Sequence, residues 1–541
     1  MAFGSGADGK MDDRPASNFV NPLLTDFYQI TMAYGYWKCG KHEHPAVFDL
    51  HFRKCPFNGE FAVFAGLEEV LRFVSEYRFS EDQIAYFRSR MPRCDPGFFD
   101  WLASVDCSRV RIQALPEGTV AFPHVPLITV EGPIAIAQLL ETTLLTLVNY
   151  ATLIATNAAR FRLAAGPEKS LLEFGLRRAQ GPDGGVSASR YSFIGGFDAT
   201  SNVQAGYLYG IPVAGTHAHS WIQSFLRLDD VRGIPLVDPQ GRGHDFLALV
   251  LQCREELGYT RTNDDELAAF IGYALAWPDN FLALVDTYDT LKSGIPNFLA
   301  VALALRRLGY RPVGIRLDSG DLAFLSKEAR RLFRQVSERF SVDFSGLKIV
   351  ASNDLNEATL LALRQQGHEI DTFGIGTHLV TCQAQPALGA VYKLVQVNGS
   401  PRIKLSQETA KVTIPGRKEV YRLIGVNGSP LLDLMMQAGE DAPRPGERIL
   451  CRHPFDEAKR AYVIPTEVIP LQQLVWEGRP SGVVSRSIVE VREYVMQQLA
   501  RLRSDHLRVL NPTPYKVSVS ENLYQFMHRL WLEESPIAEM R

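Results

Sequence analysis

Short apolar runs that do not alternate with polar residues recur along the middle of the chain. They are LLEFGL (171–176), IPVAGT (211–216), FLALVDTY (281–288), PVGIRLD (312–318), LKIVAS (347–352) and DTFGIG (371–376). Amphipathic helical patterns separate several of them, most clearly at 321–340 and 356–367. Unalternated strands between such helices are typical of parallel strands that are covered on both faces. The pattern therefore predicts an α/β core, and periodicity alone leaves open whether the sheet closes as a barrel.

The regions on either side of this core have a mixed pattern. Residues 22–37 have helical spacing, and short β-like runs follow between 46 and 135. From about 391 onward the runs are β-like again, and 483–506 has the pattern of a closing helix. The expected fold class is α/β, an irregular barrel-like core with flanking mixed α+β regions. The domain plan is a flexible tail at 1–20, a mixed α+β region at 21–165, an α/β barrel core at 166–390 and a mixed α+β region at 391–541.

A long uncharged stretch at 142–159 reaches the length at which a membrane span becomes conceivable. It carries several Thr and Asn side chains and is flanked by Glu141 and Arg160, a polar load too heavy for lipid. Leu and Ala recur along it at helical spacing. We therefore expect a long buried helix that ends the N-terminal region, and no membrane association.

Composition narrows the class of protein without naming a reaction. The chain has 541 residues, of which 46% are hydrophobic and 22% charged, the balance of a globular protein with a large core. The formal net charge is −3, so no overall basic excess indicates nucleic acid as a partner. The 7 cysteines are scattered without C-x-x-C spacing, which argues against a zinc ribbon or a disulfide framework. Because the polar N-terminus also lacks an apolar signal segment, we expect a cytosolic enzyme.

In parallel α/β folds, ligands bind at the carboxyl ends of the strands, so the polar residues that follow each apolar run are the candidate site. They are Arg177 and Arg178, Thr216 to His219, Asp286 to Tyr288, Arg316 to Asp321, Ser352 to Asp354, and Gly374 to Thr377. The set combines cations, carboxylates, two histidines and a small-residue loop. Such a composition suits a polyanionic ligand that is held together with a metal ion.

The strongest local pattern is GIRLDSGDL at 314–322. Arg316 is charged within an apolar strand, where it is costly unless it meets an anion. Asp318 and Asp321 flank a Ser-Gly turn and could hold Mg²⁺ directly or through water. The alternative is structural: Asp318 or Ser319 would cap the next helix, and Asp321 would interact favourably with its dipole.

Three further motifs each have a functional and a structural interpretation. The backbone amides of GIGTHL (374–379) could surround a phosphate, with the Thr377 hydroxyl as an added donor, or form a plain strand-to-helix turn. A histidine of THAHS (216–220) could shuttle a proton, bind a metal or accept a phosphoryl group, or could be structural. In FGLRRAQGPDGG (174–185), one arginine could bind a carboxylate through two hydrogen bonds, or both could be solvated.

Taken in order, these motifs resemble the nicotinate phosphoribosyltransferase family, of the type II phosphoribosyltransferase group, in its animal form. The resemblance covers nearly the whole chain after the tail. The stretches that carry it are PLLTDFYQITMAYGYW, FGLRRAQGPDGG, IGGFDATSN, VAGTHAHSW, GIRLDSGDL, GIGT and GAVYKL. The family condenses nicotinate with phosphoribosyl pyrophosphate to give nicotinate mononucleotide and pyrophosphate, coupled to ATP hydrolysis. The resemblance implies this reaction, a step of NAD biosynthesis from nicotinate, for the present chain.

The resemblance also implies roles for particular residues. His219 matches the family's phosphorylated histidine, whereas His217 occupies a variable position of the same pattern. Tyr28 is expected to stack on or flank the pyridine ring, in the site of a neighbouring subunit. Arg177 is the expected carboxylate-side arginine, and Thr377 is expected at the ribose phosphate. The full set expected to bind substrate is Tyr28, Arg177, Thr216, Arg316, Asp318, Gly376 and Thr377, with Asp318 and Asp321 as candidate metal ligands.

The implied cofactor is Mg²⁺, or Mn²⁺ in its place, with ATP as cosubstrate, and the implied assembly is a homodimer with a shared active site. Two alternatives stay open. Nicotinamide phosphoribosyltransferase shares the fold, but it has a TDSYK-like string where this chain reads TDFYQ, and one arginine followed by glycine where this chain has Arg177 and Arg178. The other is a catalytically silent relative that binds nucleotides, and the intact THAHS, RLDSGD and GIGT strings argue against it.

Overall fold

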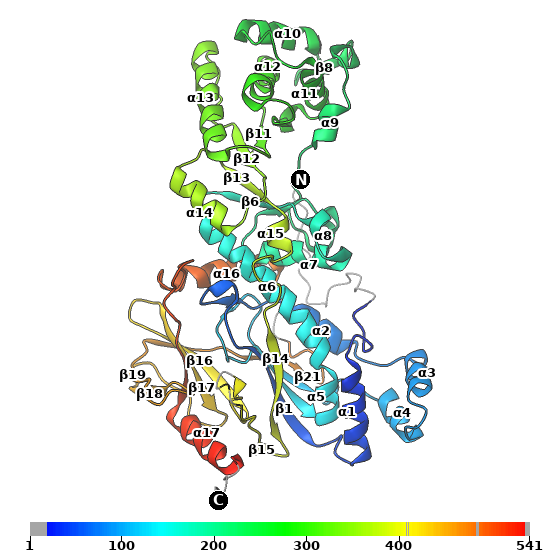
Figure 1. The fold of residues 1–541 in the computed structure, drawn as a ribbon, viewed down its shortest axis with the longest axis vertical. Helices are drawn as coiled ribbons and strands as arrows, with labels where there is room; N and C mark the ends of the chain where they lie inside the picture. The colour runs from blue at the N-terminus through cyan, green and yellow to red at the C-terminus, as the bar shows by residue number, and fades with distance from the viewer. Residues whose placement is uncertain (1–18, 407, 409–410, 483–485, 536–541) are drawn as a thin grey trace, which may run out of the picture. The chain divides into compact units, whose positions relative to one another are not determined.

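The computed structural model describes residues 19–406, 408, 411–482 and 486–535. The chain divides into two compact units, each of which is described by itself (Figure 1). Unit 1 combines residues 1–157 with residues 384–541, and unit 2 is the continuous segment 158–383. The N- and C-terminal regions of the sequence therefore fold together. The expected tail at 1–20 lies almost wholly outside the described residues.

Unit 2 is built on a six-stranded sheet in the order β10-β11-β12-β13-β6-β7, and all of its pairs are parallel. The strands are β6 (Ser170–Glu173), β7 (Ala199–Thr200), β10 (Leu282–Leu284), β11 (Gly314–Leu317), β12 (Lys348–Ala351) and β13 (Thr372–Ile375). This arrangement confirms the expected α/β core. Among the described strands the sheet ends at β10 and β7, so it is an open, half-barrel arrangement.

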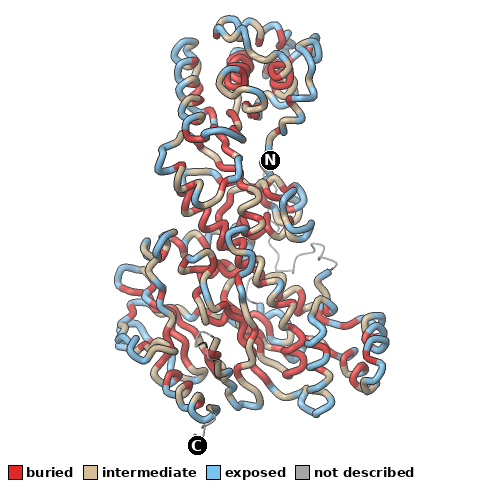
Figure 2. Tube along the Cα trace, viewed as in Figure 1, coloured by how far each residue is buried: buried red, intermediate tan, exposed pale blue. Residues whose placement is uncertain are grey.

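Helices separate the strands of unit 2 along the chain. They are α7 (Gly181–Ile194), α8 (Val203–Tyr209), α9 (His219–Gln223), α10 (Phe246–Leu257), α11 (Asp264–Ala276), α12 (Ile295–Arg307), α13 (Leu322–Phe340), α14 (Glu357–Gln366) and α15 (Thr377–Val380). The predicted helices at 321–340 and 356–367 are confirmed as α13 and α14. Every residue of α12 from Ile295 to Leu305 is buried, so this helix is enclosed by the elements around it (Figure 2).

One expected strand of unit 2 is wrong. IPVAGT (211–216) contributes only an isolated bridge between Val213 and Thr200. Pro212 has no N–H to donate to a ladder, and both Pro212 and Val213 are exposed. The neighbour of β6 is instead β7, a strand of two residues that is too short to stand out in the sequence.

Unit 1 contains a second six-stranded sheet, in the order β15-β14-β1-β5-β3-β21, whose pairs are antiparallel. The strands are β1 (Pro45–Phe52), β3 (Arg111–Ala114), β5 (Ile128–Pro133), β14 (Ala390–Val397), β15 (Ser400–Pro401) and β21 (Gln473–Glu477). The helix predicted at 22–37 is α1 (Phe27–Lys38). It ends one residue later than predicted and begins five residues later. The helices that follow are α2 (Leu67–Ser75), α3 (Glu81–Arg90), α4 (Pro96–Ala103) and α5 (Ile134–Leu139).

The long uncharged stretch is helix α6 (Glu141–Ala165), within which the division between the two units falls. Its hydroxyl groups have protein partners, since Thr156 Oγ1 accepts a hydrogen bond from Val63 N at 2.9 Å and Thr152 Oγ1 accepts one from Ala65 N at 3.1 Å. The polar load of the stretch thus serves packing inside the protein. Across the described parts of the chain, none of the helices combines the length and the apolar character that crossing a bilayer requires.

A third six-stranded sheet, also in unit 1, has the order β19-β18-β22-β17-β16-β20. Its strands are β16 (Lys418–Ile424), β17 (Pro430–Gln437), β18 (Ile449–Arg452), β19 (Arg460–Val463), β20 (Glu467–Pro470) and β22 (Val517–Ser520). The predicted closing helix at 483–506 is shorter, because α16 (Ile488–Arg501) ends where Leu502 turns extended. Residues 483–485 lie outside the described part. The chain then continues into β22 and α17 (Glu521–Glu534), which the sequence did not indicate.

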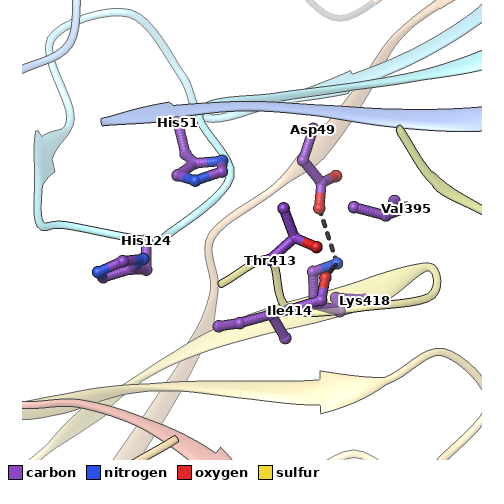
Figure 3. A pocket seen from close by; sticks show the side chains of 7 residues that line it. All are labelled: Asp49, His51, His124, Val395, Thr413, Ile414 and Lys418. Carbon is purple, nitrogen blue, oxygen red and sulfur yellow. Dashed lines mark hydrogen bonds and ion pairs between the residues drawn. The ribbon is translucent and has the colours of Figure 1, made fainter. Parts of the chain in front are cut away.

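A buried ion pair joins the two sheets of unit 1 beside a small cavity (Figure 3). Lys418 Nζ on β16 lies 2.7 Å from Asp49 Oδ2 on β1, and both side chains are almost fully buried. The cavity, of about 10 Å³, is lined by these two residues with His51, His124, Val395, Thr413 and Ile414. Its volume is near the minimum that holds one water molecule. The pair thus links strands that are far apart in the sequence.

Candidate functional site

Arg316 on β11 presents a partly buried guanidinium group at the carboxyl end of the parallel sheet. Its Nη1 donates hydrogen bonds to Thr216 Oγ1 at 2.7 Å and to the His217 carbonyl oxygen at 3.2 Å. Its Nε is buried and has no hydrogen-bond partner among the described residues. Burial lowers the pKa of Arg316, and the nearby Asp318 and Asp286 carboxylates oppose this effect. A partly buried, charged arginine with an unused, buried donor is suited to bind an anionic ligand.

Asp286, which follows β10, holds the turn after β11 in place. Its Oδ2 accepts hydrogen bonds from the Asp318 backbone N at 3.1 Å and from the Ser319 hydroxyl. Ser352, which follows β12, donates its hydroxyl to Asp318 Oδ1 at 2.6 Å. The Asp286 side chain is only 2% exposed, whereas Asp318 remains partly open. Three neighbouring strand ends are therefore tied together around the RLDSGD turn.

His219 begins helix α9 and faces the same two carboxylates. Its Nδ1 lies 3.0 Å from Thr287 Oγ1, within hydrogen-bond distance. Its Nε2 lies 3.7 Å from Asp318 Oδ2 and 4.0 Å from Asp286 Oδ1. The side chain is 41% exposed. The ring is thus oriented through one nitrogen and accessible for chemistry at the edge where Asp318 lies.

His217, two residues earlier, has a structural environment. Its Nε2 accepts a hydrogen bond from Leu284 N at 3.3 Å, and its ring packs against Tyr273 with centroids 4.7 Å apart. Burial lowers the pKa of His217 to about 4, and the positive charge of Arg316 adds to this effect. His217 is therefore neutral at ordinary pH and supports the strand end. Of the two histidines, only His219 is placed for chemistry.

The end of β6 is organised by Glu173, which is 1% exposed. Its Oε2 accepts hydrogen bonds from Ser189 Oγ at 2.8 Å and Thr200 Oγ1 at 2.6 Å, and its Oε1 accepts one from Gly175 N. The turn η2 (Leu176–Arg178) follows directly, and the Arg177 side chain is exposed there. A buried carboxylate therefore fixes the start of the turn that carries the predicted carboxylate-binding arginine.

The small-residue loop after β13 lies against this same strand end. A Cβ atom on Gly376 would lie 3.1 Å from the Phe174 carbonyl oxygen, and one on Gly374 would lie 2.5 Å from the Phe174 ring. A side chain at position 374 would therefore collide with the Phe174 ring, and at position 376 the two strand ends approach each other closely. Thr377 begins α15 and is half-buried beside this contact. The structure thus brings the GIGT loop and the turn of Arg177 together.

Asp321 has a structural role that the sequence assigned to its neighbours. It is the N-cap of α13, and its Oδ1 accepts a hydrogen bond from Phe324 N at 2.9 Å. The structural alternative, in which Asp318 or Ser319 would cap this helix, is therefore wrong as to the residue. The physical reason is that the side chains of Asp318 and Ser319 are already bonded to the neighbouring strand ends.

A magnesium ion would find oxygen ligands in this cluster. In the described portion of the chain, no group of three or more His, Cys, Asp or Glu side chains is arranged to hold a metal ion. Asp286 and Asp318 are nevertheless adjacent, and Asp286 Oδ1 is buried without a hydrogen-bond partner among those residues. Mg²⁺ is commonly held by one or two carboxylates together with water and substrate phosphates. The donor set fits that mode of binding.

Tyr28 belongs to a different unit from the cluster, because it lies on α1 of unit 1. Tyr28 is 47% exposed. The other predicted site residues all belong to unit 2. Two residues that shape the cluster, Asp286 and Ser352, were among the polar residues expected after the strands, but the sequence indicated no particular role for them. Glu173 was not among the candidates. The signal for Glu173 was a charge within an apolar run, the same signal that singled out Arg316.

A parallel α/β unit whose strand ends gather a partly buried arginine, paired carboxylates and an accessible histidine has the features of an enzyme that acts on phosphorylated substrates. Comparison with known families specifies which one. The nicotinate phosphoribosyltransferase N-terminal domain matches residues 23–149, the nicotinate phosphoribosyltransferase family matches 304–432, and its C-terminal domain matches 417–527. The chain belongs to the nicotinate phosphoribosyltransferase family, as its relatives also show.

The relatives match over nearly the full length. The nicotinate phosphoribosyltransferase of Dictyostelium discoideum is 55% identical over 98% of this chain and 91% of its own length. That of Homo sapiens is 47% identical over 97% of this chain and 99% of its own. The crystal structure of human nicotinic acid phosphoribosyltransferase superposes with a TM-score of 0.85 and 45% identity, covering 94% of this chain and 100% of that chain. The family and the fold class expected from the motifs are confirmed.

Proposed function

We propose that this chain condenses nicotinate with phosphoribosyl pyrophosphate to form nicotinate mononucleotide and pyrophosphate, with ATP hydrolysis coupled to the reaction. The near full-length relatives that carry the name nicotinate phosphoribosyltransferase support the reaction. The observation within the chain that carries the proposal is the cluster of Arg316, Asp318 and His219 at adjoining strand ends. It provides the charges that an anionic sugar pyrophosphate requires.

In this reaction the pyridine nitrogen attacks the anomeric carbon as pyrophosphate leaves, through a cation-like sugar transition state. Positioning and electrostatics supply most of the catalysis, and no side chain acts as a nucleophile toward the sugar. Arg316 offers its free Nε donor to an anionic group, with its other end fixed by Thr216. The amides and hydroxyl of Gly376 and Thr377 suit the ribose phosphate, and Arg177 suits the nicotinate carboxylate.

Mg²⁺, or Mn²⁺ in its place, would be held by Asp318 and Asp286. When bound, the ion neutralises charge on the pyrophosphate leaving group. Asp321 was the other candidate ligand, but its Oδ1 already accepts the capping hydrogen bond of α13. Asp286, whose Oδ1 is buried and free of hydrogen bonds among the described residues, is the better partner for Asp318 in this proposal.

His219 is the residue through which ATP would act. A phosphoryl group on this ring adds negative charge beside the carboxylate edge, which changes the affinity for pyrophosphate. We expect His219→Ala to abolish the stimulation by ATP and to leave a residual ATP-independent rate, measured as nicotinate mononucleotide formed with and without ATP. His244→Ala, on the β9 hairpin (Gly243–Asp245), is the control and should keep the stimulation. Unchanged stimulation in His219→Ala would refute the coupling.

The decisive assay for the reaction is product identification. The chain is incubated with phosphoribosyl pyrophosphate, Mg²⁺ and ATP, and with nicotinate or nicotinamide as the base. Nicotinate mononucleotide alone supports the proposal, whereas nicotinamide mononucleotide or no product contradicts it.

Tyr28 is proposed to complete the site of a second subunit in a homodimer, so light scattering should give about twice the chain mass of 60.4 kDa. A cytosolic location is proposed as well, supported by seven cysteines that are all free thiols.

A further inference from the structure

A buried carboxyl group in unit 2, that of Glu266 on α11, lies outside the cluster described above. Its side chain is fully buried. Its Oε2 accepts hydrogen bonds from Ser293 Oγ at 2.5 Å and from Asn297 Nδ2 at 3.0 Å. Its Oε1 has no hydrogen-bond partner among the described residues. Burying an acidic group with an unmatched oxygen is costly, and such a group calls for an explanation.

Ser293 belongs to a π-helical turn, η5 (Thr290–Gly294), which follows β10. Turns of this kind are rare and are frequently found at functional sites. Asp289 caps the turn by accepting hydrogen bonds from the backbone N of Leu291 at 3.1 Å and of Lys292 at 2.8 Å. At its other end, Ser293 Oγ also accepts a hydrogen bond from Asn263 N at 3.0 Å. The turn is therefore fastened to α11 through Ser293.

The turn presses directly on the end of β10. A Cβ atom on Gly294 would lie 1.8 Å from the Val285 carbonyl oxygen, so the two backbones are in contact and only glycine fits. Val285 immediately precedes Asp286 and Thr287. Those two residues hold the RLDSGD turn and the Nδ1 atom of His219, respectively. The position of the π turn therefore determines where Asp286 and Thr287 lie.

We propose that Glu266 is a positioning residue for His219: its carboxyl group holds the π turn against Val285 and thereby fixes Asp286 and Thr287. The expected effect of Glu266 on ATP coupling rests on the proposed phosphorylation of His219. Its effect on the positions of Asp286 and Thr287 does not. Burial raises the pKa of Glu266 to about 7, and the negative charges of Asp286 and Asp289 add to this effect. The group is therefore largely protonated in mildly acidic solution, and glutamine is its closest neutral replacement.

The test uses the full-length enzyme and three variants. Glu266→Leu keeps most of the volume but removes both hydrogen bonds, Glu266→Gln keeps an acceptor for them, and Glu357→Gln is the control. Glu357 forms a largely buried ion pair with Arg160, at 2.9 Å, elsewhere in unit 2. For each variant, kcat and KM are measured with and without ATP, phosphohistidine is quantified after incubation with ATP, and a crystal structure is determined.

We expect Glu266→Leu to lower phosphohistidine formation about 10- to 100-fold, since a displacement of about 1 Å can have that effect. The ATP-independent kcat should fall much less, and Glu266→Gln should restore both. In the crystal structure of Glu266→Leu, the distance from Thr287 Oγ1 to His219 Nδ1 should exceed hydrogen-bonding range, about 3.5 Å. If Glu266→Leu does not fold, Ser293→Ala removes the hydrogen bonds of Ser293 Oγ to Glu266 and to Asn263 N, which fasten the π turn to α11, and should show the same effects.

Two outcomes would overturn the proposal. One is that Glu266→Leu forms phosphohistidine at the wild-type rate and its crystal structure keeps the contact between Thr287 Oγ1 and His219 Nδ1. The other is that Glu266→Leu loses ATP-dependent and ATP-independent activity to the same degree, as any change in the Glu357→Gln control would do. A purely structural role of Glu266 predicts such an equal loss. If the wild-type chain forms no phosphohistidine, the role proposed for His219 fails, and the position of Thr287 in the crystal structures still decides for or against Glu266.

Discussion

At the scale of single residues, burial separates side chains that the sequence presents as equivalent. His217 and His219 are two positions apart, yet one accepts a backbone hydrogen bond in the core and the other faces Asp318. Asp318 and Asp321 flank the same turn, yet one joins the strand ends and the other caps α13. Motif resemblance singled out His219, but only the long-range contacts explain the choice in physical terms.

Arg316 offers a residue-scale prediction, because its planar fork bonds Thr216 while leaving Nε free for a ligand. Lysine would keep the charge but not this geometry. We expect Arg316→Lys to lower kcat/KM about 10²-fold, as the loss of a positioned donor commonly does. The measurement is steady-state kinetics with phosphoribosyl pyrophosphate varied. Arg311→Lys, at an exposed position shortly before β11, should stay within about twofold, and an equal effect of the two changes would contradict the assignment.

At the scale of elements, the sequence predicted those strands that are mostly buried along a continuous apolar run. The runs at 312–318, 347–352 and 371–376 became β11, β12 and β13, since parallel strands covered on both faces leave that local pattern. Strand β7 and the C-terminal pair β22 and α17 were missed, because their place depends on partners that are distant in the sequence.

The same distinction applies to the candidate site. Arg316, Asp318 and His219 carry local signals, a charge in an apolar run or a family motif. The part played by Asp286 is set by hydrogen bonds to residues 32 and 33 positions away, which no local pattern encodes. Glu173 likewise connects Gly175 with Ser189 and Thr200 only once the strands are assembled.

Gly314 at the start of β11 offers an element-scale prediction. A Cβ atom there would lie 2.0 Å from the Lys348 carbonyl oxygen on β12, so alanine would push these two neighbouring strands apart. We expect Gly314→Ala to lower the free energy of unfolding by about 1–3 kcal/mol, the usual cost of overpacking. Urea denaturation monitored by circular dichroism measures the change. Gly346→Ala, with open space around its Cβ position, should have little effect, and equal stability of the two variants would contradict the packing argument.

At the scale of the whole molecule, unit 1 depends on polar links between segments from the two ends of the chain. Lys418 bonds Asp49, and Arg422 bonds both Asp433 and the Val120 carbonyl oxygen at 2.7 Å. His51 and His124 line the cavity beside the first of these links. Burial lowers the pKa of His51 well below its usual range, and it lowers that of His124 to about 4. Neighbouring positive charges add to both effects. For His51 they are those of His124, Lys418, Arg53 and Lys393, and for His124 they are those of Arg53 and His453.

These depressed values predict that acid weakens unit 1. Because the ordinary histidine pKa of 6.5 applies to the unfolded chain, the unfolded state binds more protons than the folded state between about pH 6.5 and pH 4. The stabilisation is complete above this window and is lost as the pH falls, by about 1.4 kcal/mol per pH unit for each histidine. Urea denaturation at pH 7.5, 6 and 5 measures the slope. His124→Asn, chosen because asparagine tolerates the φ of +68° at this position, should make the slope shallower. His44→Asn should leave the slope unchanged, and equal slopes in both variants would show that the cavity does not control the acid sensitivity.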